Sequence, residues 1–152
     1  MDIKVTEQKS ELALAYKEHA TMENIVAVID KGLNMTINHL MALGKQPAGA
    51  PYCCYTNGSE DFSEFDLELG FPVAEEVPVK DGMYMARTYG GKVVESMHKG
   101  AYDTLEETYT AMMRYVQENS LEMTGVYYDW YLNDPDNTPE DELLTKVVFP
   151  VR

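Results

Sequence analysis

A single carboxylate, Asp129, lies among aromatic residues in the stretch 126–132. Side chains alternate between the two faces of a strand, so Tyr127, Asp129 and Tyr131 would share one face. A carboxylate flanked by phenol rings suits a flat organic cation, because Coulomb attraction and cation–π contact add together. The second of these contributes about 0.5–2 kcal/mol per well-placed ring. The segment therefore predicts a binding site for small cationic or aromatic molecules.

A faint internal repeat predicts the opposite wall of this site. Tyr55 and Tyr131 lie 76 residues apart, and the Phe-Pro-Val sequence at 71–73 recurs at 149–151. Duplicated halves build a groove where they meet, and such grooves are favoured sites for small ligands. By the same offset Cys53 takes the place of Asp129 in the first half. The residues expected to line the site from the first half and its rim are Pro51, Cys53, Tyr55 and Tyr89.

The elements that would position these residues follow from the spacing of apolar side chains. In the first half, strands are predicted to begin at Ile3 and at Leu12. A helix follows with Thr21 as its cap and Gly44 as its stop, and then strands over 52–56 and 65–69. In the second half we predict a hairpin of 83–89 with 93–98, a core-facing helix over 102–116, and strands over 126–132 and 143–149.

This order predicts an α+β fold in which one domain, 1–152, is built from two β-α-β-β pseudo-repeats of approximately 1–75 and 83–152. Their strands would form one antiparallel sheet, with two helices on one face and a concave ligand cleft on the other. Tyr128 and Trp130 are more apolar than the set around Asp129, so we expect them to face the helices. Tyr127, Asp129 and Tyr131 would then line the concave face.

The charge balance excludes some partners. The chain has 12 basic and 26 acidic residues, a net charge of −14. Such a field repels phosphates and no basic cluster offsets it, so we expect no direct binding to nucleic acid. The acidic surface could attract cationic ligands or a basic partner protein, or could simply keep the protein soluble. The sequence assigns no oligomeric state.

Other classes of site and location are also disfavoured. No apolar run is long enough to cross a membrane and no signal pattern begins the chain, so we expect a cytoplasmic protein without membrane contact. His19, His39 and His98 lie far apart without metal-ligand spacing, and no glycine-rich phosphate loop is present. We therefore predict neither a metal nor a cofactor. Cys53 and Cys54 are adjacent and are expected to be reduced thiols.

Three segments in order resemble one known family. They are Lys-Gly-Ala-Tyr-Asp-Thr-Leu-Glu-Glu-Thr-Tyr at 99–109, Tyr-Tyr-Asp-Trp-Tyr-Leu-Asn-Asp-Pro at 127–135 and Leu-Leu-Thr-Lys-Val-Val-Phe-Pro-Val at 143–151. They resemble the G-x-Y-x-x-L, Y-L-N-D-P and T-x-[VI]-x-x-P-[VI] patterns of the GyrI-like small-molecule-binding family. This family is also called the bacterial transcription activator effector-binding domain. The resemblance spans essentially the chain and implies a duplicated β-α-β-β fold with a central ligand cleft.

The resemblance also implies a role for Asp129. In multidrug-sensing relatives a Glu, two positions before the Tyr of Y-L-N-D-P, lies among aromatic residues and meets cationic drugs. Here that position is Asp129, one methylene shorter. Regulators of the family carry a DNA-binding domain ahead of this module. Because this chain begins directly at the first strand, the resemblance implies a stand-alone bacterial member.

The leading hypothesis is a binding protein that sequesters or senses amphipathic cationic or aromatic compounds, rather than an enzyme. One alternative is a hydrolase of strained-ring toxins, with Asp129 as general base, a tyrosine as acid, and Glu68 as a candidate second acid or base. Another is an acidic inhibitor that docks on a DNA-binding enzyme such as gyrase, as the family name suggests. A further alternative is that Asp129 faces solvent or is paired across the sheet, and that the tyrosines are ordinary strand formers.

Overall fold

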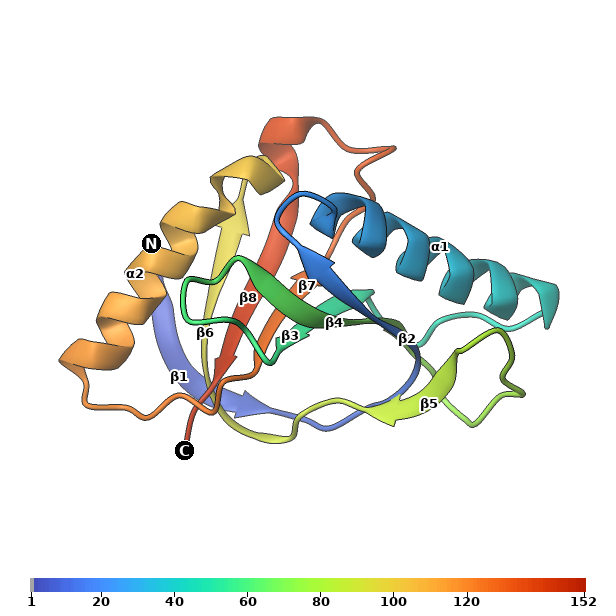
Figure 1. Ribbon diagram of the computed structural model, residues 1–152, viewed down its shortest axis with the longest axis horizontal. Coiled ribbons are helices and arrows are strands. Elements are labelled where there is room, and N and C mark those ends of the chain that lie inside the picture. The colour runs from blue at the N-terminus through green and yellow to red at the C-terminus, as the bar shows by residue number, and fades with distance from the viewer. Residues whose placement is uncertain (1) are drawn as a thin grey trace.

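A computed structural model of the protein describes residues 2–152, which form eight strands, two α-helices and two short 3-10 turns (Figure 1). The first half contains β1 (Ile3–Gln8), β2 (Leu12–Thr21), α1 (Ile25–Ala42), β3 (Tyr52–Thr56) and β4 (Glu64–Pro72). The second contains β5 (Tyr84–Arg87), β6 (Gly91–Lys99), η1 (Tyr102–Thr104), α2 (Leu105–Glu118), β7 (Tyr127–Tyr131), η2 (Glu140–Glu142) and β8 (Leu144–Pro150).

All eight strands belong to one antiparallel sheet in the order β1-β6-β8-β7-β3-β4-β2-β5. Exchanging each strand for its counterpart in the other half (β1 with β5, β2 with β6, and so on) gives the same order in reverse. The predicted α+β fold is therefore confirmed. The two halves meet where β3 pairs with β7, and in that pair Cys53 lies directly opposite Asp129.

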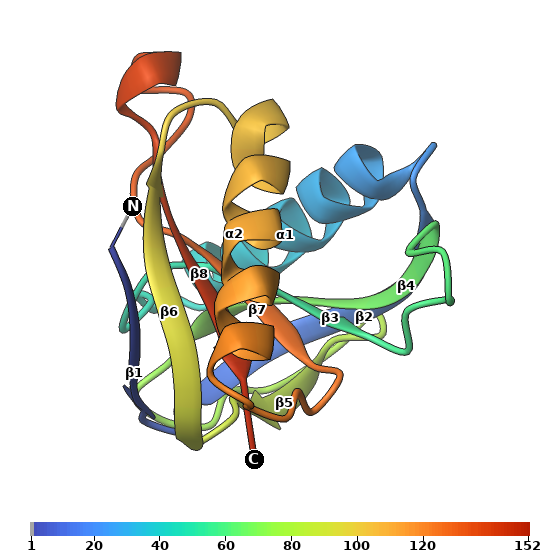
Figure 2. The ribbon, with the colours of Figure 1, turned by 90° about the vertical axis from the view of Figure 1, so that its left-hand side faces the viewer.

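Both helices lie on the same side of the sheet (Figure 2). α1 packs on β2 and β4, whereas α2 packs on β6. The helices therefore cover the outer parts of the sheet, and the central strands β3, β7 and β8 run between them. α1 can approach closely because it turns Gly32 toward β4. A Cβ at that position would lie only 2.7 Å from the Leu69 side chain.

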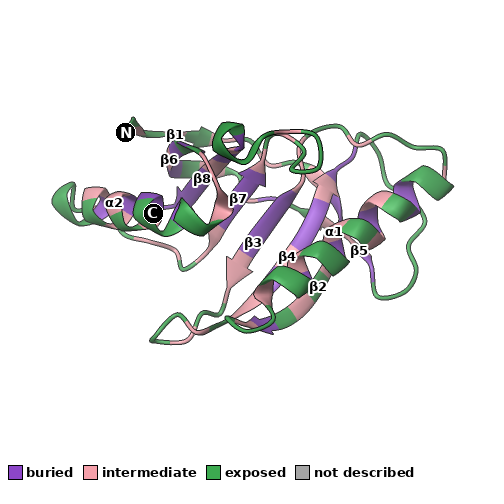
Figure 3. Cartoon of the chain, turned by 90° about the horizontal axis from the view of Figure 1, so that it is seen from above, coloured by how far each residue is buried: buried purple, intermediate pink, exposed green. Residues whose placement is uncertain are grey.

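The opposite face of the sheet is covered by two links of the chain, β1–β2 and β5–β6. An aromatic cluster of Tyr52, Tyr128 and Trp130 lies there, with Tyr89 packed against it. Gln8 accepts a hydrogen bond from the Trp130 indole at 3.2 Å, and the Tyr89 N–H donates to the Tyr128 hydroxyl at 2.9 Å. The central strands are thus buried on both faces (Figure 3).

The prediction of which side chains of β7 face the helices is wrong, although the alternation itself is correct. Tyr127 packs in the cluster under α2, and Asp129 is bonded by Tyr109 of that helix. Tyr128 and Trp130 instead belong to the cluster on the helix-free face. Relative apolarity could not decide between the faces, because Tyr128 and Trp130 on the helix-free face are buried as well as Asp129 on the other.

Two local predictions also need correction. β5 does not form a hairpin with β6 but pairs with β2 at the far edge of the sheet. Gly90 and Gly91, which lie between 83–89 and 93–98 and were expected to form the hairpin turn, serve a different purpose. A Cβ on Gly90 would lie 2.9 Å from the Ser10 Cβ, so glycine lets the β1–β2 and β5–β6 links pack closely. Thr21 ends β2, opposite Glu64, and does not cap α1, which starts four residues later.

Candidate functional site

The carboxylate of Asp129 lies at the centre of the sheet, on the face between the two helices. Its side chain is buried, with 1% of the residue exposed. Oδ2 accepts hydrogen bonds from the Tyr55 hydroxyl at 2.9 Å and the Tyr109 hydroxyl at 2.5 Å. Oδ1 has no hydrogen-bond partner within residues 2–152. One carboxylate oxygen is therefore satisfied by two phenols and the other remains free to accept.

Burial raises the pKa of Asp129 from its ordinary value of 3.8 to about 6. The bonds from Tyr109 and Tyr55 oppose this rise, as does Coulomb attraction to His98. The group is thus an anion at neutral pH, but one held in a low-dielectric setting where a counter-charge would be strongly attracted.

Aromatic rings surround the carboxylate. Tyr131 meets Tyr102 edge to face, with ring centroids 5.5 Å apart, and Tyr55 meets Phe65 in the same way at 5.5 Å. Burial raises the pKa of Tyr55 and Tyr131 well above 10.0, so both hydroxyls stay neutral hydrogen-bond donors. The walls next to Asp129 are therefore flat and uncharged.

The structure brings most of the predicted residues together. Cys53 and Tyr131 pack with Tyr55 in the cluster under α1. Tyr127 lies further along the same face, edge to face with Phe149 at 5.2 Å. Pro51 joins through its backbone, because its carbonyl accepts the Tyr131 N–H at 2.9 Å.

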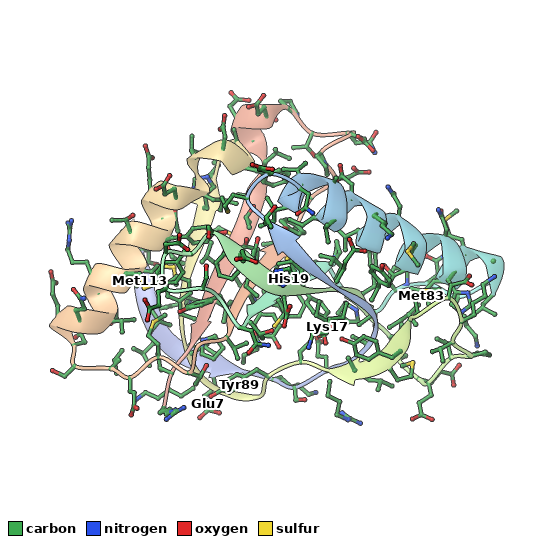
Figure 4. The ribbon with its side chains drawn as sticks, in the orientation of Figure 1. Glu7, Lys17, His19, Met83, Tyr89 and Met113 are labelled. Carbon is green, nitrogen blue, oxygen red and sulfur yellow. The ribbon has the colours of Figure 1, made fainter. Side chains whose placement is uncertain are left out.

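One predicted residue, Tyr89, lies apart from the others. It sits in the β5–β6 link on the helix-free face, near the lower edge of the molecule in Figure 4. Its hydroxyl donates to the carbonyls of Lys92 and Val151, each at 3.3 Å. Tyr89 therefore stabilises the covered aromatic cluster, on the opposite side of the sheet from Asp129.

Sequence reasoning missed three residues of this face: Tyr109, His98 and Thr145. Tyr109 was assigned only to the core-facing stripe of its helix. A tyrosine in such a stripe was a usable signal, because a buried hydroxyl requires a partner. His98 bonds Thr108 at 2.8 Å and Thr104 at 2.9 Å, which ties β6 to the start of α2. No sequence pattern pointed to Thr145, which is fully buried on β8.

Glu68 does not join Asp129. It lies opposite Cys54 on the helix-free face, where its two oxygens accept the hydroxyls of Tyr52 at 2.8 Å and Tyr84 at 2.5 Å. The prediction that Glu68 could serve as a second acid or base beside Asp129 is therefore wrong. Side chains alternate along β4, and Leu67 and Leu69 point to the helix face. Glu68, which lies between them, therefore points to the opposite face from Asp129.

A cleft of about 570 Å³ opens between the start of α1, η1 and the loop before β8. Its wall includes Tyr102, whose ring meets that of Tyr131 edge to face, so the cleft lies next to the cluster around Asp129. Two carboxylates, Asp103 and Glu140, line it together with apolar atoms. The remaining lining residues are Val26, Pro135, Thr138 and Leu143.

The described residues give no support for a metal site, a cysteine nucleophile or a membrane-spanning helix. Within 2–152 no group of three or more His, Cys, Asp or Glu side chains could hold a metal ion. Both cysteines are buried free thiols, and burial raises the pKa of Cys54 to about 12, so neither is an activated nucleophile. None of the described helices is long and apolar enough to cross a bilayer.

The chain is similar in fold to several solved structures. The C-terminal domain of EcmrR shares 18% identity over 99% of this chain and 97% of its own, with a TM-score of 0.80. SAV2435 bound to tetraphenylphosphonium shares 10% identity over 100% and 94%, with a TM-score of 0.74. A hydrolase from Listeria innocua shares 17% identity over 99% and 91%, with a TM-score of 0.60.

At these identities the likeness concerns the fold alone. No curated protein matches the chain by sequence. The model of one protein family, however, matches residues 1–152 and carries the description "GyrI-like small molecule binding domain". This match confirms the resemblance first drawn from the three segments of the second half. The chain therefore belongs to the family of GyrI-like small-molecule-binding domains.

Proposed function

We propose that the protein binds amphipathic organic cations on the face between its helices, with Asp129 as the counter-charge, and thereby sequesters or senses them. The observation that carries the proposal is the Asp129 carboxylate: it is buried, and its Oδ1 lacks a partner within residues 2–152. Burying such a group without a partner costs about 1–3 kcal/mol or more. A cationic ligand placed against Oδ1 would recover that energy.

The tyrosines next to Asp129 supply the rest of the proposed site. Rings of Tyr55, Tyr109 and Tyr131 would give flat contacts to an aromatic ligand, and a cation against a ring face gains about 0.5–2 kcal/mol. One structural neighbour is bound to tetraphenylphosphonium, an aromatic cation, which supports the same ligand class here.

The ligand would enter from the cleft beside η1. Tyr102 lines this cleft and packs on Tyr131, so rotation of these two rings would open a path toward Asp129. The rim carboxylates Asp103 and Glu140 would raise the local concentration of cations, an effect that salt weakens. The net charge of −14 acts in the same direction.

Thermal unfolding with a panel of aromatic ammonium and phosphonium ions and neutral analogues tests the proposal. Linkage predicts stabilisation of about 2.7 kcal/mol for a ligand present at a hundred times its dissociation constant. We expect cations to stabilise the wild type and neutral analogues not to. Asp129→Asn should weaken cation binding by roughly 1–3 kcal/mol.

Glu68→Gln is a matched control for this experiment. It also neutralises a carboxylate that accepts two tyrosine hydroxyls, but on the opposite face of the sheet. We expect Glu68→Gln to leave cation affinity unchanged. Equal losses in the two variants would mean that net charge alone attracts the cations. Unchanged affinity in Asp129→Asn would remove this residue from the site.

A hydrolytic function is the second candidate, because a carboxyl with a pKa of about 6 lies within hydrogen-bond distance of two phenols. Asp129 could act as general base toward water, and Tyr55 or Tyr109 could protonate a leaving oxygen. The fold of a hydrolase from Listeria innocua is similar. Turnover of a strained-ring electrophile that is lost in Asp129→Asn would favour this function over simple binding.

A further inference from the structure

Two buried polar atoms on neighbouring strands lack hydrogen-bond partners within residues 2–152: Asp129 Oδ1 and Thr145 Oγ1. Both residues are essentially inaccessible, with exposed fractions of 1% and 0%. A third such atom, His39 Nδ1, lies on α1, and its ring already bonds the Pro78 carbonyl through Nε2. The first two atoms are the ones that could share a ligand.

The strand register places these two atoms on the same face. β7 and β8 pair so that Val147 is opposite Asp129 and Thr145 is opposite Tyr131. Asp129 and Thr145 are thus diagonal neighbours, which in an antiparallel pair lie on the order of 7–8 Å apart at the backbone. Since both side chains point to the side of the helices, one small polar group could contact Oδ1 and Oγ1 together.

Several polar groups around this pair are already engaged with other partners. Asp129 Oδ2 accepts from Tyr55 and Tyr109. His98, which is opposite Thr145 on β6, bonds the Thr108 hydroxyl through Nδ1 at 2.8 Å. Its Nε2 lies 3.2 Å from the Ala101 carbonyl, to which it donates. None of these groups is free to satisfy Asp129 Oδ1 or Thr145 Oγ1.

The chemistry of the two free atoms specifies what a ligand must bring. An ionised carboxylate oxygen can only accept hydrogen bonds, and a threonine hydroxyl can accept as well as donate. A primary or secondary ammonium ion carries two or more N–H donors on one charged nitrogen. A quaternary ammonium or a phosphonium ion carries the same charge but no hydrogen to donate, so it would balance the charge of Asp129 but leave both atoms without a hydrogen bond, and it would bind more weakly.

We propose that the site takes a primary or secondary ammonium ion, whose N–H groups bond Asp129 Oδ1 and Thr145 Oγ1, and that it discriminates against quaternary cations. This inference rests on the proposed function, and it narrows the ligand class from organic cations in general to amines with N–H donors. The aromatic part of the amine would lie against Tyr131 and Tyr102, toward the cleft.

A pair of probes that differ only at nitrogen tests this inference: 4-phenylbutylammonium and 4-phenylbutyltrimethylammonium, each titrated calorimetrically into the wild type. A charge-assisted hydrogen bond is worth roughly a tenfold change in affinity or more. We therefore expect the primary ion to bind at least tenfold more tightly. Thr145→Val, which keeps the shape and removes the hydroxyl, should weaken the primary ion several-fold and leave the trimethyl ion unchanged. Thr145→Ser should retain the preference.

The outcomes separate the two proposals. Equal affinity for the two probes, or a preference that persists fully in Thr145→Val, would overturn this inference and leave Asp129 as a plain counter-charge. If neither probe binds and no cation of the broader panel does, the proposed function fails together with this inference. Unfolding of Thr145→Val by denaturant identifies any loss that comes from the fold, and the Thr145→Ser result then decides.

Discussion

Replacing Asp129 by asparagine should change the pH dependence of stability in a calculable way. The pKa of this carboxyl is about 6 in the folded protein and near its ordinary 3.8 in the unfolded chain. Between these values the folded state binds more protons than the unfolded state. The contribution of Asp129 to stability therefore falls as pH rises through this window and stays level above it. The Asp129→Asn variant lacks this loss, because an amide does not titrate.

The magnitude follows from the two pKa values. At about 1.36 kcal/mol per pH unit, the full interval corresponds to roughly 3 kcal/mol at pH 7.5. At pH 4 less than about 1 kcal/mol of this remains, because the carboxyl is then partly protonated in the unfolded chain as well. Asp129→Asn should thus gain roughly 2–3 kcal/mol relative to the wild type between pH 4 and pH 7.5. Any fixed cost of placing an amide there cancels in this difference.

Urea unfolding at several pH values, followed by the fluorescence of Trp130, measures this difference directly. Trp130 is the single tryptophan of the chain and lies in the aromatic cluster of the helix-free face. The exposed residue Asp30 provides the control, because Asp30→Asn removes one charge without changing the buried site. Stability curves of wild type and Asp129→Asn that stay parallel from pH 4 to pH 7.5 would refute the raised pKa, and with it the description of Asp129 as a desolvated anion.

Two further substitutions test the surroundings of this site. Tyr109→Phe removes a hydroxyl that lowers the pKa of Asp129. The pH at which the stability contribution of Asp129 levels off should therefore move above about 6. If this pH does not change, the Tyr109 hydroxyl does not bond Asp129. Gly32→Ala puts a Cβ 2.7 Å from the buried Leu69, which should lower the free energy of unfolding by about 1–2 kcal/mol after the helix-propensity gain. The exposed neighbour Asn34→Ala serves as control, and stabilisation by Gly32→Ala would contradict the close packing of α1.

Much of the fold was accessible from the sequence because local patterns determine strands and helices. The alternation over 52–56 matched β3, and the stripe over 102–116 matched η1 with α2. The internal repeat predicted that the two halves join in one sheet, since the same order of elements occurs in both halves. The pairing of β5 with β2 was not accessible, because a glycine pair between two short strands looks the same whether it makes a turn or lets two links pack together.

The candidate site was predicted in part for a similar reason. Period-two alternation correctly grouped Tyr127, Asp129 and Tyr131, and the repeat correctly added Cys53 and Tyr55. Alternation cannot say which face a helix covers when both faces are buried. Side chains that contact Asp129 from other elements cannot be predicted from the sequence pattern of β7. The contact of the Tyr109 hydroxyl and the position of Thr145 therefore became known only from the structure.

The position of Asp129 at the junction of the two halves explains how one substitution in a duplicated fold creates a charged site. Cys53 and Asp129 are equivalent in the repeat and face each other across the β3–β7 pair. Leu33 of α1 and Tyr109 of α2 are also 76 positions apart and also differ in polarity. Leu33 packs in the cluster that contains Cys53, whereas the Tyr109 hydroxyl donates to Asp129. The half with the carboxylate thus carries one of the two hydroxyls that hold it, and the other comes from Tyr55 in the half with the thiol. Because a buried carboxylate is costly without hydrogen-bond partners, the charge depends on phenols from both halves, although only the second half supplies the carboxylate itself.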